Sequence, residues 1–393
     1  MRPTRRALQT GTMDLDTRYP AISDLAARAK RRVPRFVWDY LDSATGTEAT
    51  ARRNRAALDR ILFRPSILHG EITQDLSVEI LGQRFEKPFG IAPVGMSGLI
   101  WPDAEATLAR LGRDAGLPYT LSTVASRAPE EVGPHTGGTA WFQLYPPRDP
   151  GVLDDMLARV RAAGFGTLVL TADVPVASRR ERQRKGGLKQ PPRLTPRLMA
   201  QTALNPAWAL GTLRHGMPRM RFLESYMKAD RSLPSTAHIG YLLRTAPGWD
   251  YVARLRAAWD GPLLVKGVLT AGDAVRLRET GADGIWVSNH AGRQFDAAPA
   301  SIDVLPEIRA AVGPDCPLIF DSGVAGGLDV LRAMALGADM VMLGRAFHYG
   351  LAAFGAAGAA HVAHILTEDL LSNMGQMGLA RLAEARDRLI PQD

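Results

Sequence analysis

The most informative stretch of this chain is GIWVSNHAGRQFD, residues 284–296. Its first four residues form a short apolar run that predicts a buried strand. Polar groups begin where the run ends, with His290 and Arg293 three positions apart in a glycine-containing turn. A guanidinium can hold a carboxylate by paired hydrogen bonds while an imidazole removes a proton beside it. The stretch therefore predicts a strand whose carboxyl end carries chemistry.

Seven further apolar runs have the same character and alternate with segments of helical spacing. They cover residues 89–92, 118–121, 140–144, 167–170, 262–265, 317–320 and 339–343. Continuous apolar strands that alternate with helices indicate a parallel sheet covered on both faces. Eight such units in about 250 residues match an α/β fold, the (β/α)8 TIM barrel, here over about residues 88–350. A doubly wound open sheet is the alternative, but this sequence lacks the GxGxxG turn that usually follows its first strand.

The residues before the barrel predict an N-terminal helical extension of a single domain that spans residues 1–393. Residues 1–20 are expected to be a disordered lead-in. Ser23 is a candidate helix cap, and the helical spacing that follows it is interrupted near Pro34. A polar helix is expected at about 47–60, and alternating apolar residues predict a strand at 76–80.

A long insertion follows the fourth strand, at about residues 179–245, and far exceeds an ordinary loop. It begins with many basic residues against a single Glu181 and continues with apolar residues at helical spacing. Two interpretations stay open. The insertion is either a solvated lid with a helical subdomain, or a basic amphipathic patch over about 179–230 that lies on anionic lipid. Nucleic acid is disfavoured as a partner because no binding motif accompanies the charge.

The composition is that of a folded protein from a reducing compartment. The single cysteine, Cys316, excludes a disulfide within the chain, and no Cys/His spacing indicates a metal site. The net charge is +8 and the pI is near 9.9. The sequence shows neither a signal peptide nor an apolar run long enough to cross a membrane. We therefore expect a cytoplasmic location, with peripheral attachment to the inner face of the membrane as the alternative.

Each of the eight apolar runs ends in a hydrogen-bonding or charged group, or in a glycine that exposes the backbone. In order, the ends carry Pro93-Val94-Gly95, Ser122, Gln143 with Tyr145, Thr171 with Asp173, Lys266, Ser288-Asn289-His290, Asp321, and Gly344-Arg345. Barrels of this type bind ligands at these ends, so the pattern predicts a polar ligand. The neutral groups suit a heteroaromatic ring, Lys266 suits a ring that gains negative charge, and Asp321 suits hydroxyl groups. The last two strand ends stand where barrels bind phosphate, so the three parts together suggest flavin mononucleotide (FMN).

Seven short motifs carry a resemblance to a known family. They are SNHAGRQFD (288–296), WFQLY (141–145), LTADVP (170–175), RRE (179–181), LVKG (264–267), IAPVG (91–95) and LGR (343–345). In these motifs and their order the chain resembles the FMN-dependent L-2-hydroxy-acid dehydrogenases and oxidases, which include lactate, glycolate and mandelate enzymes. The likeness covers the chain from about Pro34 to the C-terminal helices.

The resemblance implies a role for each matching residue. His290 corresponds to the catalytic base, and Asp173 corresponds to the carboxylate that orients and stabilises the protonated histidine. The residues implied to bind the substrate are Tyr40, Tyr145, Arg180 and Arg293. The residues implied to bind FMN are Pro93, Val94, Gly95, Ser122, Gln143, Thr171, Lys266, Ser288, Asp321, Ser322, Gly323, Gly344 and Arg345. The implied reaction oxidises an L-2-hydroxy acid, lactate-like or mandelate-like, to the 2-oxo acid.

Departures from the family pattern bear on the cofactor and on the electron acceptor. Many relatives have an arginine in the phosphate loop, where this chain reads DSGVAGG with Ala325 and Gly326. Gly95 stands where many oxygen-using relatives have alanine. This and the basic, apolar insertion favour a quinone or cytochrome as the acceptor. An oxygen-using oxidase and a non-catalytic flavin-binding barrel are the alternatives, and the resemblance further implies a homo-oligomer, a homotetramer.

Overall fold

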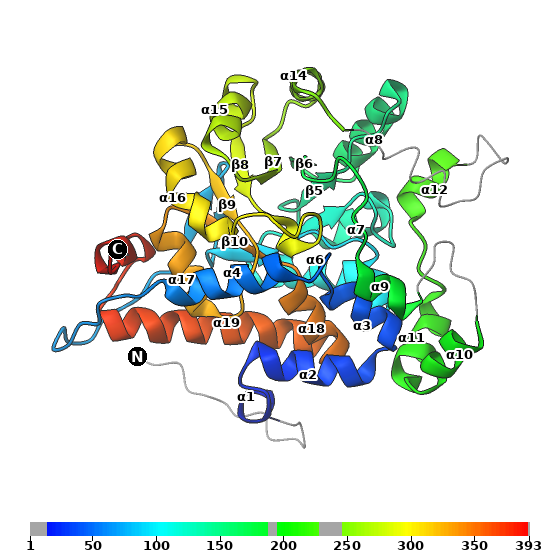
Figure 1. Ribbon diagram of the computed structural model, residues 1–393, viewed down its shortest axis with the longest axis horizontal. Coiled ribbons are helices and arrows are strands. Elements are labelled where there is room, and N and C mark those ends of the chain that lie inside the picture. The colour runs from blue at the N-terminus through cyan, green and yellow to red at the C-terminus, as the bar shows by residue number, and fades with distance from the viewer. Residues whose placement is uncertain (1–13, 188–194, 228–245, 392–393) are drawn as a thin grey trace.

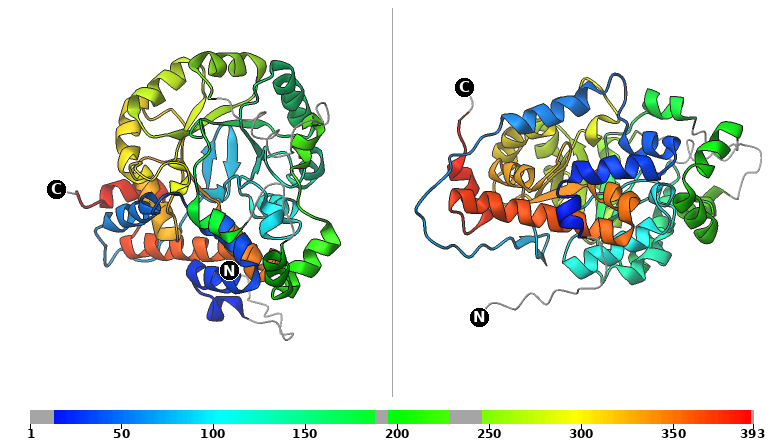
Figure 2. Two further views of the ribbon diagram at one scale, coloured as in Figure 1. Left: turned by 45° about the vertical axis from the view of Figure 1, so that its right-hand side comes forward. Right: turned by 90° about the horizontal axis from the view of Figure 1, so that it is seen from below.

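Eight parallel strands form one closed sheet at the centre of the molecule. The computed structural model describes residues 14–187, 195–227 and 246–391. The strand order is β3-β10-β9-β8-β7-β6-β5-β4, and a parallel bridge between Ile91 and Tyr119 joins its two ends. The helices form a ring around the sheet (Figures 1 and 2). The predicted (β/α)8 barrel is confirmed.

All eight strands begin within two residues, and end within three residues, of the predicted apolar runs. Their bounds are β3 (Phe89–Ile91), β4 (Thr120–Ser122), β5 (Trp141–Leu144), β6 (Thr167–Thr171), β7 (Leu263–Val268), β8 (Gly284–Val287), β9 (Leu318–Phe320) and β10 (Met340–Leu343). The helices of the barrel are α5 (Ser97–Ile100), α6 (Ala104–Ala115), α7 (Pro129–Val132), α8 (Pro150–Ala162), α14 (Trp249–Ala258), α15 (Ala271–Glu279), α16 (Ser301–Val312), α17 (Gly327–Ala335), α18 (Arg345–Phe354) and α19 (Ala356–Met377). Short 3-10 turns are η1 (Gly133–His135), η2 (His290–Gly292) and η3 (Leu382–Arg388).

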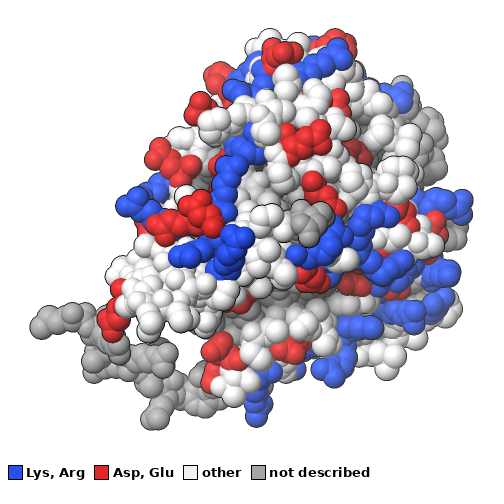
Figure 3. All heavy atoms as spheres, turned by 60° about the vertical axis from the view of Figure 1, so that its left-hand side comes forward, with Lys and Arg blue, Asp and Glu red and all other residues white. Residues whose placement is uncertain are grey.

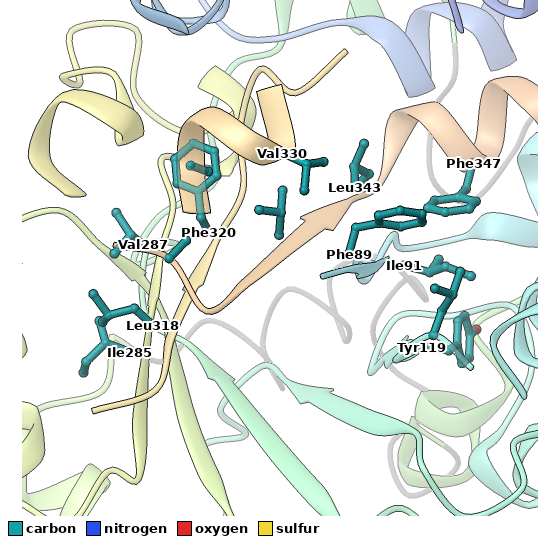
Figure 4. Close-up of a cluster of buried hydrophobic side chains, with 14 of the residues drawn as sticks. Phe89, Ile91, Tyr119, Ile285, Val287, Leu318, Phe320, Val330, Leu343 and Phe347 are labelled. Carbon is teal, nitrogen blue, oxygen red and sulfur yellow. The ribbon is translucent and has the colours of Figure 1, made fainter. Parts of the chain in front are cut away.

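Side chains of each strand alternate between the barrel interior and the surrounding helices. In β8, Ile285 and Val287 belong to the outer apolar cluster, while Trp286 belongs to the inner one. Figure 4 shows outward side chains of several strands with Val330 of α17 and Phe347 of α18. Burial on both faces explains why the strands read as continuous apolar runs.

A β-hairpin packs against the inner cluster of the barrel. It consists of β1 (Val78–Ile80) and β2 (Gln83–Phe85), joined by Leu81 and Gly82, which both take positive φ. Two such residues match the tight turn that twisted hairpins favour. The sequence predicted the first strand, but the second was missed because QRF carries one apolar residue. The inner cluster comprises Ile80, Phe85, Ala92, Trp141, Val169, Leu264, Trp286, Ile319, Met340 and Met342.

The N-terminal extension differs in detail from its prediction. It contains α1 (Leu15–Arg18), α2 (Ile22–Arg32), α3 (Arg35–Asp42) and α4 (Ala49–Arg60). The helix α1 contradicts disorder over the last part of the lead-in, whereas residues 1–13 lie outside the described residues. Ser23 is not the cap: α2 begins one residue earlier, and the carboxylate of Asp24 accepts the N–H of Ala21 at 3.0 Å. The interruption at Pro34 and the polar helix are confirmed.

Four helices of the insertion are described, while residues 188–194 and 228–245 lie outside the described part. They are α9 (Glu181–Gly186), α10 (Pro196–Ala203), α11 (Pro206–His215) and α12 (Arg221–Met227). Trp208 of α11 anchors the insertion, since its ring packs against Phe36 and its indole N–H donates to Leu99 O at 2.9 Å. Among residues 14–187, 195–227 and 246–391, no helix is long and apolar enough to cross a membrane.

The surface charge is unevenly distributed. On the face shown in Figure 3, acidic and basic side chains alternate over the upper part, and Lys and Arg predominate along the right-hand side. Many arginines on the described surface form ion pairs, such as Arg256 with Asp283 at 2.6 Å. Much of the positive charge of this protein, whose net charge is +8, is therefore compensated locally by neighbouring carboxylates.

Trp141 provides a test of the inner cluster. Its side chain is fully buried and meets Trp286 edge to face, with ring centroids 6.3 Å apart. Trp141→Ala is expected to lower the free energy of unfolding by about 3–5 kcal/mol, because it leaves a large cavity. Trp141→Phe should cost much less, because the indole N–H has no partner among the described residues. Urea denaturation measures both, and equal losses would contradict the packing role.

Candidate active site

The carboxyl ends of the strands enclose a cavity of about 440 Å³. Every predicted site residue lines it except Asp173 and Ser288, and these two hydrogen-bond to His290, which does. The lining residues from the prediction are Tyr40, Pro93, Val94, Gly95, Ser122, Gln143, Tyr145, Thr171, Arg180, Lys266, His290, Arg293, Asp321, Ser322, Gly323, Gly344 and Arg345. The barrel thus brings together residues more than 300 positions apart in the sequence.

The end of α3 and the start of α4 cover one side of this cavity, through Tyr40, Leu41, Ala51 and Arg55. Arg293 holds the end of α3 by donating from Nη1 to Tyr40 O at 2.9 Å and to Ser43 O at 2.7 Å. The carboxylate of Asp296 accepts the backbone N–H of Thr47 at 2.8 Å. Both anchors belong to the loop after β8, and α4 packs against η2 of the same loop. The N-terminal extension is therefore part of the site wall, which is how Tyr40 reaches the cavity.

His290 and Asp173 form a hydrogen-bonded pair beside the cavity. The Nδ1 atom of His290 lies 3.0 Å from Asp173 Oδ1. A carboxylate at this position keeps the proton on Nδ1, so Nε2 remains free to accept a proton. Burial lowers the pKa of His290, and the attraction of Asp173 offsets this only in part. Burial would raise the pKa of Asp173, but the charge and hydrogen bond of His290 outweigh it and lower that pKa.

The backbone of the His290 turn is held in an unusual conformation. His290 and Ala291 take φ values of 55° and 54°, in the left-handed region that non-glycine residues seldom adopt. The N–H of His290 donates to Ser288 Oγ, and the N–H of Ala291 donates to Ser322 Oγ, each at 3.0 Å. These bonds fix the direction in which the imidazole points.

A second anchor of this turn was not found from the sequence. Asn289 and Asn54 of α4 exchange two buried hydrogen bonds of 2.9 and 2.6 Å between their side chains. Ser301 Oγ accepts the N–H of Asn289 at 2.9 Å. Asn54 lies in a polar helix whose sequence gives no sign of a buried partner, so no local pattern could have identified it.

Lys266 is buried with a carboxylate partner. Its ammonium lies 2.8 Å from Asp321 Oδ2 and 2.5 Å from Ser288 Oγ. Asp321 also accepts from Trp286 Nε1, Ser288 Oγ and Ser322 Oγ, at 2.9, 2.6 and 2.7 Å. Four protein donors thus occupy the carboxylate that was expected to meet hydroxyl groups. Asp321 serves here to hold Lys266 in place.

Three guanidinium groups face the cavity without a carboxylate partner in the described part of the chain. They belong to Arg180, Arg293 and Arg345. Burial, together with repulsion from Arg180 and Arg345, lowers the pKa of Arg293 to about 9. A group so perturbed gains stability from a nearby anion. The cavity is therefore built to receive negative charge.

Comparison with known proteins identifies the family. The family model of FMN-dependent dehydrogenases matches residues 29–392. The chain belongs to this family. It is 38% identical to the L-lactate dehydrogenase of Xanthobacter autotrophicus over 373 residues, which are 94% of this chain and 95% of that enzyme. The predictions of an oxidoreductase and of FMN as cofactor are confirmed.

Solved structures of the family resemble this one closely. The monotopic membrane protein (S)-mandelate dehydrogenase gives a TM-score of 0.89 at 34% identity, covering 95% of this chain and 99% of that chain. A mandelate oxidase variant gives a TM-score of 0.78 at 34% identity, covering 95% of this chain and 98% of that chain. Dehydrogenases and oxidases therefore share this architecture.

The polar groups of the cavity fit FMN. Gln143 Nε2, Thr171 Oγ1 and Arg345 Nε are buried and have no hydrogen-bond partner among the described residues. Ser122 Oγ donates to Gln143 Oε1 at 2.7 Å, which orients the amide so that its nitrogen can donate to a ligand. Buried polar groups normally have partners, so the two N–H donors indicate a ligand with acceptor groups, and the Thr171 hydroxyl can meet either a donor or an acceptor.

The end of the cavity near Ala325 carries an arginine that was not predicted. Arg55 of α4 lines the cavity there, but its guanidinium bonds to Asp59, Asp329 and Gly323 O. These bonds occupy its five donors. The N–H of Ala325 donates to Asp329 at 2.8 Å, so it too is already bound. The expected supply of backbone N–H groups for phosphate is thus smaller than the sequence suggested.

Ala325→Arg is expected to tighten FMN binding by about tenfold or more, because a charge-assisted hydrogen bond contributes roughly 1.5–3 kcal/mol. The affinity is measured by titrating the apoprotein with FMN and monitoring the quenching of flavin fluorescence. Ala325→Leu is the control for side-chain size without charge. Equal affinities in the two variants would show that phosphate does not approach this position.

Proposed function

We propose that this protein oxidises a small L-2-hydroxy acid to the 2-oxo acid. The observation that carries the proposal is the placement of His290, with its Asp173 partner, in one cavity with Arg180 and Arg293. A carboxylate between two guanidinium groups would hold the neighbouring hydroxyl-bearing carbon beside the imidazole. Two similar proteins are named L-lactate dehydrogenase and (S)-mandelate dehydrogenase, and lactate and mandelate are both 2-hydroxy acids.

Each side chain has a separate task in this reaction. Arg180 and Arg293 bind the carboxylate, which fixes the acid and holds the reacting carbon in place. His290 Nε2 accepts a proton, from the hydroxyl in a hydride mechanism or from the α-carbon in a carbanion mechanism. Asp173 stabilises the imidazolium that results. FMN, when bound, accepts the two electrons.

Tyr40 and Tyr145 would donate hydrogen bonds to the substrate. Burial raises the pKa of both phenols, so they remain protonated over the working range of the enzyme. Tyr40 Oη donates to Gly95 O at 2.8 Å in this structure, so substrate would compete for that proton. Lys266 would stabilise negative charge on the reduced ring, because its buried ammonium lines the cavity and Asp321 holds it in place.

We propose a quinone or cytochrome, rather than oxygen, as the electron acceptor. Gly95 lies close against Val124: a Cβ at this position would fall 2.6 Å from Val124 Cγ2, so the alanine of many oxygen-using relatives would not fit here unless Val124 moved. The oxidase is the second candidate, since a mandelate oxidase shares the fold. Turnover with a quinone-like dye and little peroxide supports the dehydrogenase, and strong peroxide formation supports the oxidase. A non-catalytic flavin barrel is disfavoured because His290 and both arginines are present.

We further propose that the insertion binds the membrane surface. Helices α10 and α11 and the residues after each of them expose large apolar side chains: Met199, Leu204, Leu210, Leu213 and Met217. Leu204 and Leu213 are each 80% exposed. The exposed Arg197, Arg214 and Arg219 lie in the same segment and can attract anionic headgroups. The similarity to a monotopic membrane protein supports this placement.

Replacement of the base tests the reaction. His290→Asn suits the left-handed backbone, because asparagine tolerates positive φ, and it should lower kcat/KM by about 10²–10⁴-fold while FMN remains bound. In the wild type, kcat/KM should rise with pH along an acid limb below about 6.5, since burial lowers the pKa of His290 and only the neutral imidazole accepts a proton.

Asp173→Asn is the matched variant for the same pH profile. Asp173 raises the pKa of its partner, so its neutralisation should move the acid limb to lower pH as well as slow the reaction. Dye-coupled assays on lactate, glycolate and mandelate measure both effects. Full activity of His290→Asn, or an acid limb that stays in place in Asp173→Asn, would contradict these roles.

Loss of exposed leucines tests the membrane contact. The double variant Leu210→Asp, Leu213→Asp should bind vesicles of phosphatidylglycerol and phosphatidylethanolamine about tenfold or more weakly, because two apolar side chains leave the lipid. The control variant Leu210→Met, Leu213→Met should bind as the wild type does. Co-sedimentation at low and high salt measures both, and equal binding of the acidic and control variants would refute the proposed surface.

A further inference from the structure

A buried histidine behind the cofactor cavity takes no part in the reaction described above. His348 lies on α18 and is 1% exposed, and its side chain does not line the cavity. Its Nδ1 lies 2.8 Å from Gly344 O, and its Nε2 lies 2.8 Å from Ser97 Oγ. Ser97 is also buried, and its hydroxyl lies 2.8 Å from Val94 O.

These contacts connect two loops that both line the cavity. Val94 belongs to the loop after β3, which was predicted to bind FMN, and Gly344 begins the turn after β10, which was predicted to bind its phosphate. The register between β3 and β10 ends at Ile91 and Leu343. Beyond it, one backbone hydrogen bond joins the two segments in the described part of the chain, from Ala92 N–H to Leu343 O at 3.1 Å. The side chains of His348 and Ser97 connect the loops past that point.

The proton of His348 can be placed from its partners. A carbonyl oxygen only accepts, so the contact with Gly344 O requires a proton on Nδ1. Burial lowers the pKa of His348 to about 4, and the hydrogen bond to Gly344 opposes this only weakly. The imidazole is therefore neutral near pH 7, and Nε2 must accept from the hydroxyl of Ser97. That hydroxyl has one proton and two acceptors, Nε2 and Val94 O, each 2.8 Å away, so it alternates between them or shares its proton in a bifurcated hydrogen bond.

We propose that His348 and Ser97 form a positioning pair that fixes the distance between the Pro93–Gly95 loop and the Gly344–Arg345 turn. The two loops already pack closely at this point, since a Cβ on Gly344 would lie 3.0 Å from Val94 Cγ2. FMN would have to contact both loops at once, so their separation must match its length. Preorganised contacts lose less free energy on binding than contacts formed with the ligand.

The phosphate end of this chain makes such preorganisation more important. Ala325 supplies no side-chain donor, its N–H is bound to Asp329, and the donors of Arg55 are occupied. Among the described residues at this end of the cavity, Arg345 is then the main cation available to bind phosphate. It follows Gly344 directly in the chain. Movement of Gly344 away from Val94 would carry Arg345 with it. The inference concerns cofactor binding alone and holds for either electron acceptor and for any acid.

A double-mutant cycle on FMN affinity tests the positioning pair. Ser97→Ala, His348→Leu and the double variant are titrated as apoproteins with FMN, with no substrate present. Each single change is expected to weaken binding by about fivefold to tenfold, the effect of one lost buried hydrogen bond. The FMN affinity of the double variant should equal that of the single variant with the larger loss, because both changes break the same connection. Losses that multiply in the double variant, or single variants with unchanged affinity, overturn the proposal.

Two controls separate positioning from general stability. His361 is another buried histidine, with Nε2 2.9 Å from Tyr19 O, and His361→Leu should reduce thermal stability while leaving FMN affinity unchanged. Ser97→Thr retains the hydroxyl and should restore affinity. If His348→Leu does not fold, Ser97→Ala against Ser97→Thr decides: weaker binding in the alanine variant alone supports the pair, and equal binding overturns it. The FMN titrations are independent of the proposed reaction. If they give the expected losses of affinity while the wild type shows no hydroxy-acid activity, the proposed reaction is rejected and the positioning pair is retained.

Discussion

The closure of eight parallel strands is the constraint on which the rest of this structure depends. Parallel strands all end on the same side, and the bridge between Ile91 and Tyr119 turns the sheet into a ring. The carboxyl ends of all eight strands therefore surround one cavity. The side chains that line this cavity could not otherwise meet, because they are spread over more than 300 residues of chain. The burial of both sheet faces stabilises this ring, and the polar groups are confined to its rim.

The rim concentrates positive charge in a place of low solvent access. Lys266 has its own partner in Asp321, but Arg180, Arg293 and Arg345 have no carboxylate partner among the described residues. An unpaired buried cation is costly, so the site is stabilised when anions enter. The carboxylate of an acid and the phosphate of FMN are two such anions. Burial, helped by repulsion from Lys266 and Arg180, lowers the pKa of His290 and so favours the neutral imidazole that can accept a proton.

Precision in this site comes from buried hydrogen bonds between protein groups. Asn54 holds the left-handed turn that carries His290, and Asp321 holds Lys266. The turn between α3 and α4 brings Tyr40 to the cavity wall because the loop after β8 anchors it. His348 and Ser97 extend the same principle to the two cofactor loops. The barrel thus supplies the framework, and buried hydrogen bonds set the positions within it.

The sequence by itself determined the barrel and the chemical identity of its rim. The bounds of the eight apolar runs fell within three residues of those of the eight strands, because strands buried on both faces need continuous apolar side chains. The polar residue that ends each run then follows directly from the fold. Short or mixed segments were read less well: β2, with one apolar residue in QRF, was missed, and α1 replaced part of an expected disordered lead-in.

Only the tertiary structure decided which polar groups were already occupied. Asp321 and the N–H of Ala325 were available for ligands in the sequence, yet protein partners fill them in the fold. Asn54, Arg55 and His348 gave no local signal at all. Their partners lie tens to hundreds of residues away in the chain. Hydrogen bonds depend on distance and direction in space, and a sequence records neither for residues that only folding brings together.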